Sequence, residues 1–304
     1  MNDVTFGLCL PNFRIGASRE GIDAALETAE RLGWESVWTT DHILPDSSAR
    51  AKDYWSIFDA VATLAYAAAR TNRVRLGTSV LVVPMRNAVE QAKTLASVDA
   101  LSDGRLMVGV GIGWSEIEYA NAGLADRFRV RGAYLDEAIR VWRHLWSGSK
   151  EPFNGRFQSF EEFNFEPLPA QGAAVPVLVG GRADAALRRA GQLGDGYQAT
   201  STSPAQYVER AAAVRAAAEE AGRPEPHLSV RVQVFFDETP HGFYALAGTP
   251  QQMAADIEAF HQAGAGHVLV DLREVEPERT VRAMERFDRE IVQRFRSPER
   301  GART

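Results

Sequence analysis

Residues 75–111, RLGTSVLVVPMRNAVEQAKTLASVDALSDGRLMVGVG, carry the pattern that decides the fold. An apolar run at 75–83 is followed by Pro84, and a second apolar run occupies 105–110. Between the two runs, alanine, leucine and valine recur at helical spacing behind Asn87, a residue type that caps helices well. The stretch therefore predicts a strand, a helix and a second, parallel strand, because parallel strands need a crossover and a helix usually supplies it.

The same alternation continues in both directions along the chain. Two later helices open on capping boxes, SPAQ at 203–206 and TPQQ at 249–252. Apolar runs predict eight buried strands, at residues 4–10, 36–40, 75–83, 105–110, 175–179, 196–199, 228–236 and 267–272.

Eight such units are typical of one closed barrel. They average 38 residues each over a chain of 304. The alternative is an open doubly wound sheet, but residues 9–12, CLPN, lack the glycine-rich turn that such a sheet places after its first strand. We therefore predict the α/β class and a single (β/α)₈ TIM barrel over residues 1–296.

Two segments fall outside the alternation. Residues 147–174, between the fourth and fifth units, are rich in Phe, Gly and Pro. They predict an inserted loop or short hairpin, a kind of segment that often serves as a lid or an interface. We expect residues 297–304 to form a flexible tail.

Composition excludes several classes of protein. With 34 basic and 40 acidic side chains the net charge is −6, which argues against a nucleic-acid partner. No run of about 20 apolar residues is present, so we expect no membrane span. The single cysteine, Cys9, cannot form an internal disulfide, and the six histidines show no metal-binding spacing. With no apparent signal peptide, these features favour a cytoplasmic protein without a metal site.

In a TIM barrel the active site forms where the strands end. Asp41 and His42 follow the second strand, and His42 could transfer a proton near neutral pH. The alternative is that Asp41 caps a loop and His42 is solvated.

Glycine-rich turns follow the fourth and fifth strands. Gly111 and Gly113, with Ile112 and Trp114, could admit a planar ligand close to the backbone; the alternative is tight strand packing. The sequence Gly180-Gly181-Arg182 leads into a helix and could bind a phosphate; the alternative is a plain turn.

Three further features concern charge and strand irregularity. Small polar residues at 77–79 predict a bulge in the third strand. Strand alternation turns Arg231 into the barrel, where it needs an anionic ligand or, as the more favoured alternative, an internal ion pair. We interpret Glu116 and Glu118 as solvated acids at a helix start.

Taken in order, the motifs resemble those of the bacterial luciferase-like superfamily, the luciferase-like monooxygenase family. The resemblance is closest to its branch of deazaflavin (coenzyme F420)-dependent oxidoreductases and covers residues 6–272. The motifs are WTTDH at 38–42, LGTSVL at 76–81, SDGR at 102–105, GVGIGW at 109–114, RGAYLDEA at 131–138, LWSG at 145–148, FNFEP at 163–167 and VGG at 179–181.

The resemblance implies a TIM barrel that binds F420, or FMN, at its mouth and transfers a hydride to or from a small organic substrate. It places a third-strand bulge, often with a non-proline cis peptide, at Ser79 and Val80, against the ring. It places His42 near the reactive edge of the ring, as a catalytic residue. The remaining implied cofactor-binding residues are Asp41, Gly111, Ile112, Gly113, Trp114, Val179, Gly180, Gly181 and Arg182.

The chain also departs from part of that branch. Sugar-phosphate dehydrogenases of the branch carry a glutamate where this chain has Trp114, and a tryptophan where it has Asp46. A substrate other than a sugar phosphate is therefore expected, with His42 as the first candidate proton donor and Glu116 as the second.

The resemblance leaves two other functions open. One is an FMN-dependent monooxygenase supplied with reduced flavin by a partner reductase, with residues 147–174 closing its pocket. The other is a non-catalytic flavin-binding protein. Relatives are often homodimers, and a separate cofactor-reducing enzyme is an expected partner.

Overall fold

The computed structural model describes residues 4–236, 240 and 243–296, so the predicted tail at 297–304 lies outside the described residues. Eight parallel strands form a closed ring in the order β9-β11-β1-β2-β3-β4-β7-β8, and β8 pairs again with β9. This arrangement confirms the predicted (β/α)₈ barrel. Their bounds are β1 Thr5–Cys9, β2 Ser36–Thr39, β3 Arg75–Val82, β4 Leu106–Gly111, β7 Val177–Gly180, β8 Gly196–Thr200, β9 His227–Phe236 and β11 His267–Asp271.

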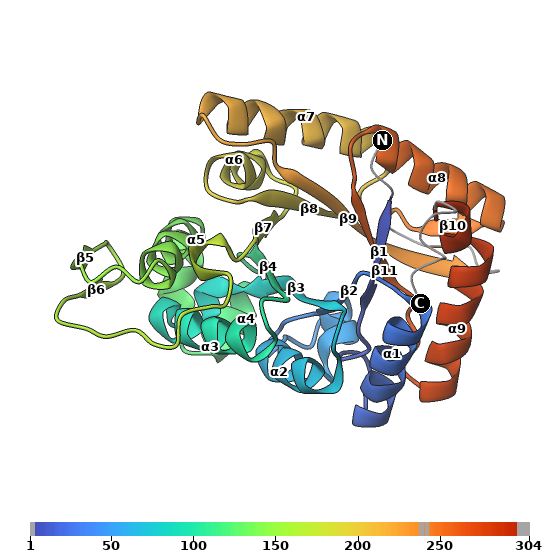
Figure 1. Ribbon diagram of the computed structural model, residues 1–304, viewed down its shortest axis with the longest axis horizontal. Coiled ribbons are helices and arrows are strands. Elements are labelled where there is room, and N and C mark those ends of the chain that lie inside the picture. Colours follow the sequence, from blue (N-terminus) through green and yellow to red (C-terminus); the bar gives the residue numbers. More distant parts are fainter. Residues whose placement is uncertain (1–3, 237–239, 241–242, 297–304) are drawn as a thin grey trace.

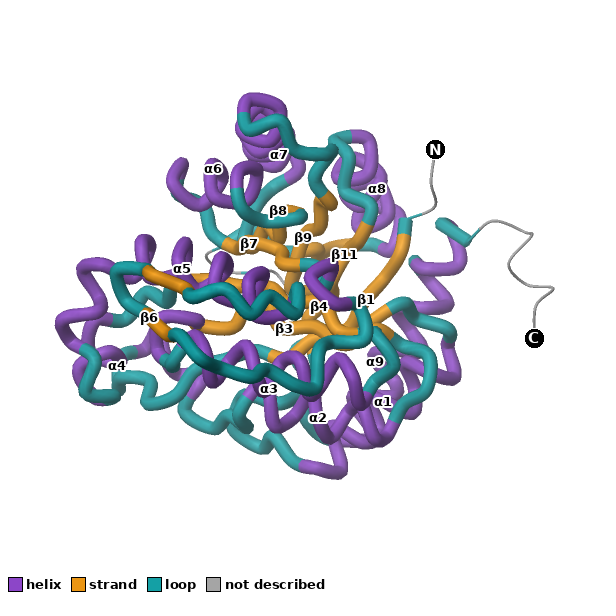
Figure 2. Tube along the Cα trace, turned by 60° about the vertical axis from the view of Figure 1, so that its left-hand side comes forward, coloured by secondary structure: helices purple, strands orange, loops and turns teal. Residues whose placement is uncertain are grey.

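Helices surround the ring of strands (Figures 1 and 2). They are α1 Arg19–Leu32, α2 Ala60–Arg70, α3 Ala88–Leu101, α4 Glu116–Asn121, α5 Ala125–Trp146, α6 Asp184–Gln192, α7 Pro204–Glu220, α8 Pro250–Gln262 and α9 Pro277–Glu290. Asn87 caps α3, and both predicted capping boxes are formed, at the starts of α7 and α8. A short strand, β10 Leu246–Gly248, extends the sheet beside β9.

The fourth unit has an additional helix. Its main helix, α5, begins at Ala125, before the motif at 131–138, and a separate short helix, α4, precedes it. Ser115 caps α4 through the amide of Glu118. This additional turn lies directly after β4, at the end of the barrel where the site is expected.

The third strand contains the predicted irregularity. The register between β3 and β4 shifts between Thr78 and Leu81, and the Ser79–Val80 peptide is cis. The shift confirms the predicted bulge, and the cis bond is the one that the family resemblance implies.

The indole of Trp38 is buried inside the barrel. A Cβ at Gly77 would lie 2.2 Å from the Trp38 ring, and one at Gly7 would lie 2.9 Å from its Nε1. Trp38 packs with four other buried residues inside the ring: Cys9, Met107, Leu178 and Leu269. The two glycines therefore provide the space that lets this tryptophan close the middle of the barrel.

The insertion at 147–174 forms a short hairpin, β5 Phe153–Asn154 with β6 Ser159–Phe160. The hairpin lies on the outer side of α5, at the edge of the molecule (Figure 1). The buried carboxylate of Glu137 on α5 accepts hydrogen bonds from the amides of Arg156, Phe157 and Gln158, at 2.6, 2.7 and 2.7 Å. The predicted hairpin is thus confirmed, and α5 anchors it.

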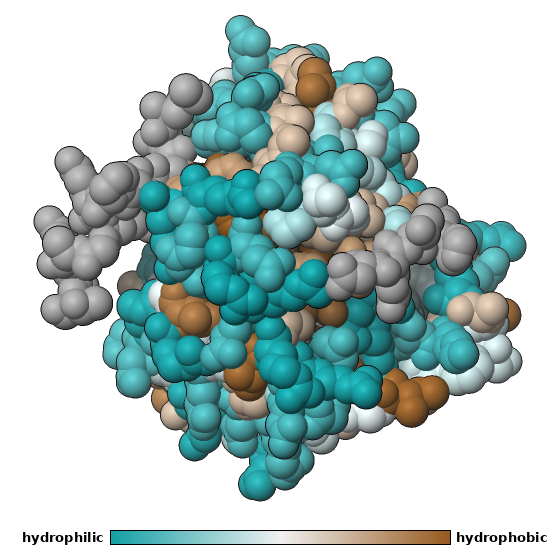
Figure 3. All heavy atoms as spheres, turned by 90° about the vertical axis from the view of Figure 1, so that its right-hand side faces the viewer, coloured by the Kyte–Doolittle hydropathy of each residue, from teal (hydrophilic) through white to brown (hydrophobic). Residues whose placement is uncertain are grey.

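On the side of α8 and α9, the surface is mostly hydrophilic, with apolar residues in small scattered groups (Figure 3). Ion pairs such as Arg282–Glu278 and Arg286–Glu290 run along α9. Among the described residues, no helix is both long enough and apolar enough to cross a membrane.

The Glu137 anchor makes a prediction about the hairpin. Glu137→Gln replaces a charged acceptor of three amides, so we expect the free energy of unfolding to fall by about 2 kcal/mol. Hydrogen exchange at residues 156–158 should accelerate. Glu151→Gln, in the same insertion, is the matched control and should change neither quantity. Unaltered exchange at 156–158 in the Glu137 variant would contradict the anchoring role.

Candidate functional site

A cavity of about 290 Å³ opens at the carboxyl ends of the strands. Such a volume lies near the lower end of the range for small-molecule sites. Its walls come from residues within, at the ends of or directly after six of the eight strands. The lining residues are Thr40, Asp41, His42, Tyr54, Ser79, Val80, Val82, Gly111, Ile112, Gly113, Trp114, Gly180, Gly181, Arg182, Gln198, Thr200 and Arg231.

The cavity gathers almost the whole set of residues that the sequence assigned to the site. The exception is Val179, whose side chain is buried in the hydrophobic core between strand and helix. No residue of the insertion at 147–174, all of which is described, lines the cavity. The insertion is therefore not a wall of this site, contrary to the lid role expected for it.

His42 is held by a buried carboxylate. Its Nδ1 lies 2.7 Å from Oε2 of Glu118, and the two side chains are only 6% and 1% exposed. The His42 ring lies against Tyr54, with centroids 4.1 Å apart, and meets Trp114 edge-on. Because Glu118 occupies Nδ1, Nε2 is the ring nitrogen without a partner among the described residues, and it is available to a bound molecule.

Glu118 corrects the interpretation drawn from the sequence. It is not a solvated acid at a helix start; only Glu116 is exposed there. Burial by itself would raise the pKa of Glu118. The hydrogen bond and charge of His42, with the amides of Ile43 and Leu44, outweigh burial and lower the pKa below 4.5. Sequence spacing gave no signal for this pair, since 75 residues lie between its members.

Asp41 is fully engaged by protein groups. Arg86 donates to both of its carboxylate oxygens, at 2.6 and 2.8 Å, and the amide of Val82 donates to Oδ2 at 2.8 Å. Burial lowers the pKa of Arg86, but the adjacent Asp41 and Asp59 carboxylates raise it more strongly, above its ordinary value. Asp41 thus fixes the end of β3 against the loop after β2. This role is close to the alternative considered from the sequence, in which Asp41 caps a loop.

Val80 explains two of the glycines in the cavity. A Cβ on Gly111 would lie 2.6 Å from Cγ2 of Val80, and one on Gly180 would lie 2.8 Å from its Cγ1. The packing alternative for the turn after the fourth strand is therefore correct in part, because Gly111 makes room for the Val80 side chain. Gly180, for which the alternative was a plain turn, makes room for the same side chain. Packed in this way, Val80 presents an apolar surface to the cavity.

Arg231 reaches the barrel interior, as strand alternation predicts. Its Nη1 donates to the carbonyl oxygen of Ser79, and its Nη2 lies 3.6 Å from Oδ2 of Asp271. Arg14 binds the same carboxylate with two hydrogen bonds, at 2.9 and 2.8 Å. Burial alone would raise the pKa of Asp271; the two arginines hold it well below its ordinary value. The internal ion pair is confirmed, and it fixes the Ser79 carbonyl on one wall.

The outer rim carries the remaining predicted residues. Gly113 and Gly181 have positive φ angles, +67° and +136°, which favour glycine. The hydroxyl of Tyr197 donates to the carbonyl of Gly181 at 2.8 Å, which fixes the turn before α6. Arg182 is exposed there, and Arg50 stacks over Trp114 with its guanidinium 4.1 Å from the ring centroid.

Sequence reasoning missed five lining residues: Thr40, Tyr54, Val82, Gln198 and Thr200. Two of them have buried polar atoms without a hydrogen-bond partner, Oγ1 of Thr40 and Nε2 of Gln198. A signal for Gln198 was present, because it is a polar residue inside the short apolar strand at 196–199. Buried polar groups are normally hydrogen-bonded, so those without a protein partner in a cavity commonly bond to a ligand or a water molecule.

The chain is similar in sequence to proteins of one known family. A profile of the luciferase-like monooxygenase family matches residues 5–242. An F420-dependent glucose-6-phosphate dehydrogenase of Kineococcus radiotolerans is 32% identical over 221 residues, which cover 70% of this chain and 63% of that protein. The alignment thus spans less than two thirds of the relative's length.

Solved structures share the fold over nearly the whole chain. An F420-dependent secondary alcohol dehydrogenase, in complex with an F420–acetone adduct, superposes with a TM-score of 0.81 at 20% identity and covers 98% of this chain and 100% of its own. Monooxygenase RslO1 from Streptomyces bottropensis superposes with a TM-score of 0.79 at 22% identity, covering 96% and 100%. At these identities, the likeness shows the fold alone.

The His42–Glu118 pair predicts a pH-dependent contribution to stability. The folded-state pKa of Glu118 is below 4.5, so its stabilisation is complete above that pH and is lost as pH falls through the folded value. We expect Glu118→Gln to lower the free energy of unfolding by about 3 kcal/mol at pH 7, and this loss should shrink steadily as the pH is lowered from 4.5 to the most acidic pH at which the wild-type protein stays folded. Urea unfolding over that pH series measures the loss. Glu116→Gln, the exposed neighbour on α4, should have little effect at any pH; a loss for Glu118→Gln that stays constant over the whole series would refute the pairing.

Proposed function

The chain belongs to the luciferase-like monooxygenase family, and from that premise we propose that it transfers a hydride between coenzyme F420 and a small organic substrate. One observation carries the proposal. The cavity at the carboxyl ends of the strands brings the buried His42–Glu118 pair together with two polar atoms that have no partner. A site of this kind supplies both a proton-handling group and specific contacts for a polar-edged ring.

The residues present fit a deazaflavin. Oγ1 of Thr40 and Nε2 of Gln198 are a hydroxyl and an amide donor, suited to the carbonyl-rich edge of the pyrimidine ring. Val80 and Ile112 offer apolar surface to the ring system. Gly181 and Arg182, at the turn before α6, would hold the phosphate-bearing side chain.

When bound, F420 supplies a hydride donor in its reduced form and a hydride acceptor in its oxidised form. His42 would hold or release the accompanying proton at Nε2. Glu118 keeps Nδ1 occupied and orients the ring. Tyr54 and Trp114, packed against that ring, would restrict the access of water to it.

The substrate that the site favours is a small organic molecule other than a sugar phosphate. Trp114 occupies the position of the glutamate found in sugar-phosphate dehydrogenases of the branch. The carboxylate nearest to His42 is instead Glu118, which is buried behind the imidazole and does not line the cavity. Among the described lining residues, His42 is therefore the acid–base group that we assign to the substrate.

Two partners complete the proposal. A separate enzyme would restore the redox state of F420 between turnovers, and a second copy of the chain would form a homodimer.

A freely exchanging cofactor and one buried cysteine, Cys9, suit a cytoplasmic setting. Burial raises the pKa of the Cys9 thiol to about 11, so this thiol is unreactive.

Cofactor titration tests the proposal directly. We expect F420 to bind at least about tenfold more tightly than FMN. Quenching of tryptophan fluorescence provides the readout, because Trp114 lines the cavity. Gln198→Leu, which removes a donor at nearly constant size, should weaken F420 binding about tenfold. Tighter binding of FMN would replace the F420 proposal with the monooxygenase alternative, and binding of neither would dismiss both.

Replacement of His42 separates binding from chemistry. We expect His42→Ala to keep its affinity for F420 while turnover falls by roughly 10²-fold, as on loss of a general acid or base. Tyr54→Phe, which keeps the ring stacked on His42, is the matched control and should retain turnover. Turnover unchanged in the His42 variant would remove His42 from the mechanism.

A further inference from the structure

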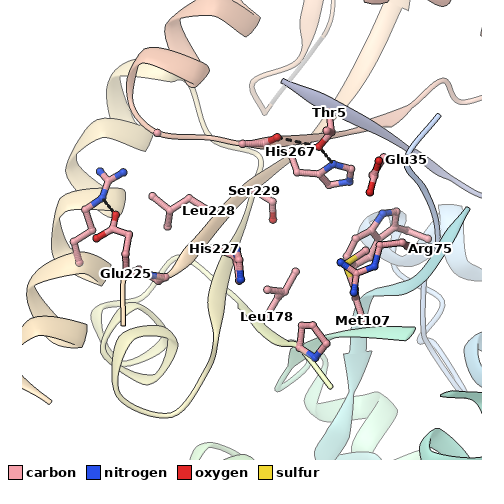
Figure 4. Close-up of a pocket in the computed structure, with 16 residues that line it drawn as sticks. Thr5, Glu35, Arg75, Met107, Leu178, Glu225, His227, Leu228, Ser229 and His267 are labelled. Carbon is pink, nitrogen blue, oxygen red and sulfur yellow. Dashed lines mark hydrogen bonds and ion pairs between the residues drawn. The ribbon is translucent and has the colours of Figure 1, made fainter. Parts of the chain in front are cut away.

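A second cavity, of about 360 Å³, opens at the opposite end of the barrel, where the strands begin. Figure 4 shows its side chains arranged around an open centre. Its lining comes from the starts of β1, β2, β3, β4, β7, β9 and β11 and from the turns before them. It shares no lining residue with the cavity at the mouth.

The inner wall of this cavity is apolar. Trp38, Met107 and Leu178 line it, and all three belong to the cluster that fills the middle of the barrel. Leu228 adds apolar surface from β9. A TIM barrel usually fills its interior with layers of side chains, so an open space of this size beneath Trp38 indicates room for an apolar group.

Most polar groups of the cavity already have partners. His267 contacts the hydroxyl of Thr5 at 2.7 Å through Nδ1 and that of Ser36 at 2.9 Å through Nε2. Burial lowers the pKa of His267 to about 3, so it stays neutral at physiological pH. Ser229 donates to the carbonyl of Tyr197. The remaining charged and titratable lining groups are Glu35, Arg75, Arg215, Glu225 and His227.

Arg75 is the arginine of this set without a partner. Arg215 is paired, with Nε 2.6 Å from Glu225 and Nη1 donating to the carbonyl of Ala263. By contrast, the half-buried guanidinium of Arg75 forms no hydrogen bond and no ion pair with any described residue, and burial lowers its pKa. The carboxylates of Glu35 and Asp99 attract it only at a distance, without an ion pair. Arg75 and Met107 both line the cavity and come from the paired strands β3 and β4 (Figure 4).

We propose that this cavity binds a small organic monocarboxylate with an apolar body, distinct from any ligand of the mouth. The carboxylate pairs with the fork of Arg75, which matches two oxygens in one plane. The apolar body covers Met107 and Leu178. Glu35 and Glu225 on the same rim disfavour anions with more than one charge, so a carboxylate suits the site better than a phosphate.

Methionine methyl NMR tests the proposal, with sodium octanoate as the probe. The chain has five methionines, and Met107 alone lines this cavity among the four that lie in the described residues. We expect octanoate to shift the Met107 methyl resonance in a saturable way, while Met85, Met253 and Met284 stay in place. Octanol, of the same length but uncharged, should bind at least about tenfold more weakly.

Two variants separate the charge from the space. Arg75→Met should reduce octanoate affinity about tenfold and abolish the preference over octanol, whereas Arg140→Met, at an exposed arginine of α5, should change neither. A Cβ at Gly266 meets no atom within 4 Å, so Gly266→Leu should place its side chain in the cavity and block both probes.

Three results would overturn the proposal: no saturable shift of Met107, equal affinity for octanoate and octanol, or unchanged octanoate binding in Arg75→Met. Far-ultraviolet circular dichroism establishes that each variant is folded. F420 titration at the mouth should be unaltered in all of them, so failure here is distinguishable from failure of the proposed function.

Discussion

The closure of eight parallel strands into a ring is the constraint on which the rest of this structure depends. Because all strands run in the same direction, every turn that leaves a strand arrives at one end of the barrel. Residues as distant in sequence as Thr40 and Arg231 therefore line one cavity of about 290 Å³. The same constraint gathers the strand starts at the other end, around the cavity that Arg75 lines.

Pairing of buried charge is the second theme. Burying an unpaired charge costs desolvation free energy, and the buried groups at the mouth offset it by pairing. The pairs are His42 with Glu118, Asp41 with Arg86, and Asp271 with Arg14 and Arg231. These pairs fix the loop after β2 and the Ser79 carbonyl. These contacts lie next to the place where a cofactor would bind, and Nε2 of His42 has no partner among the described residues.

The glycines at the mouth can be explained in two ways, by ligand binding and by the packing of neighbouring side chains. The turns at Gly111 and Gly180 resemble ligand-binding loops, yet their immediate reason is the bulk of Val80. Likewise Gly77 makes room for Trp38. The two readings are compatible, because the side chain that the glycines accommodate is also the surface that the cavity presents.

By itself, the sequence determined the fold class, the strand order implied by eight repeated units, the capped helix starts and the end of the barrel that holds the site. These features are local or periodic: apolar runs, helical spacing, capping residues and turn glycines are each legible within a few positions. It also placed His42 and the glycine turns at the mouth, since strand ends converge in any such barrel, whereas Val80 was placed there by the family resemblance.

Only the tertiary structure decided which polar groups meet. The Glu118 carboxylate looked like a solvated helix start, and Asp41 like a ligand-facing acid. Val179 followed a binding motif but turned into the core, and the insertion that looked like a lid lies on the outside of α5. Gln198 and Thr40 gained importance only as buried atoms left without partners. Pairing across 75 intervening residues depends on distances and burial in space, and no spacing rule along a chain encodes those quantities.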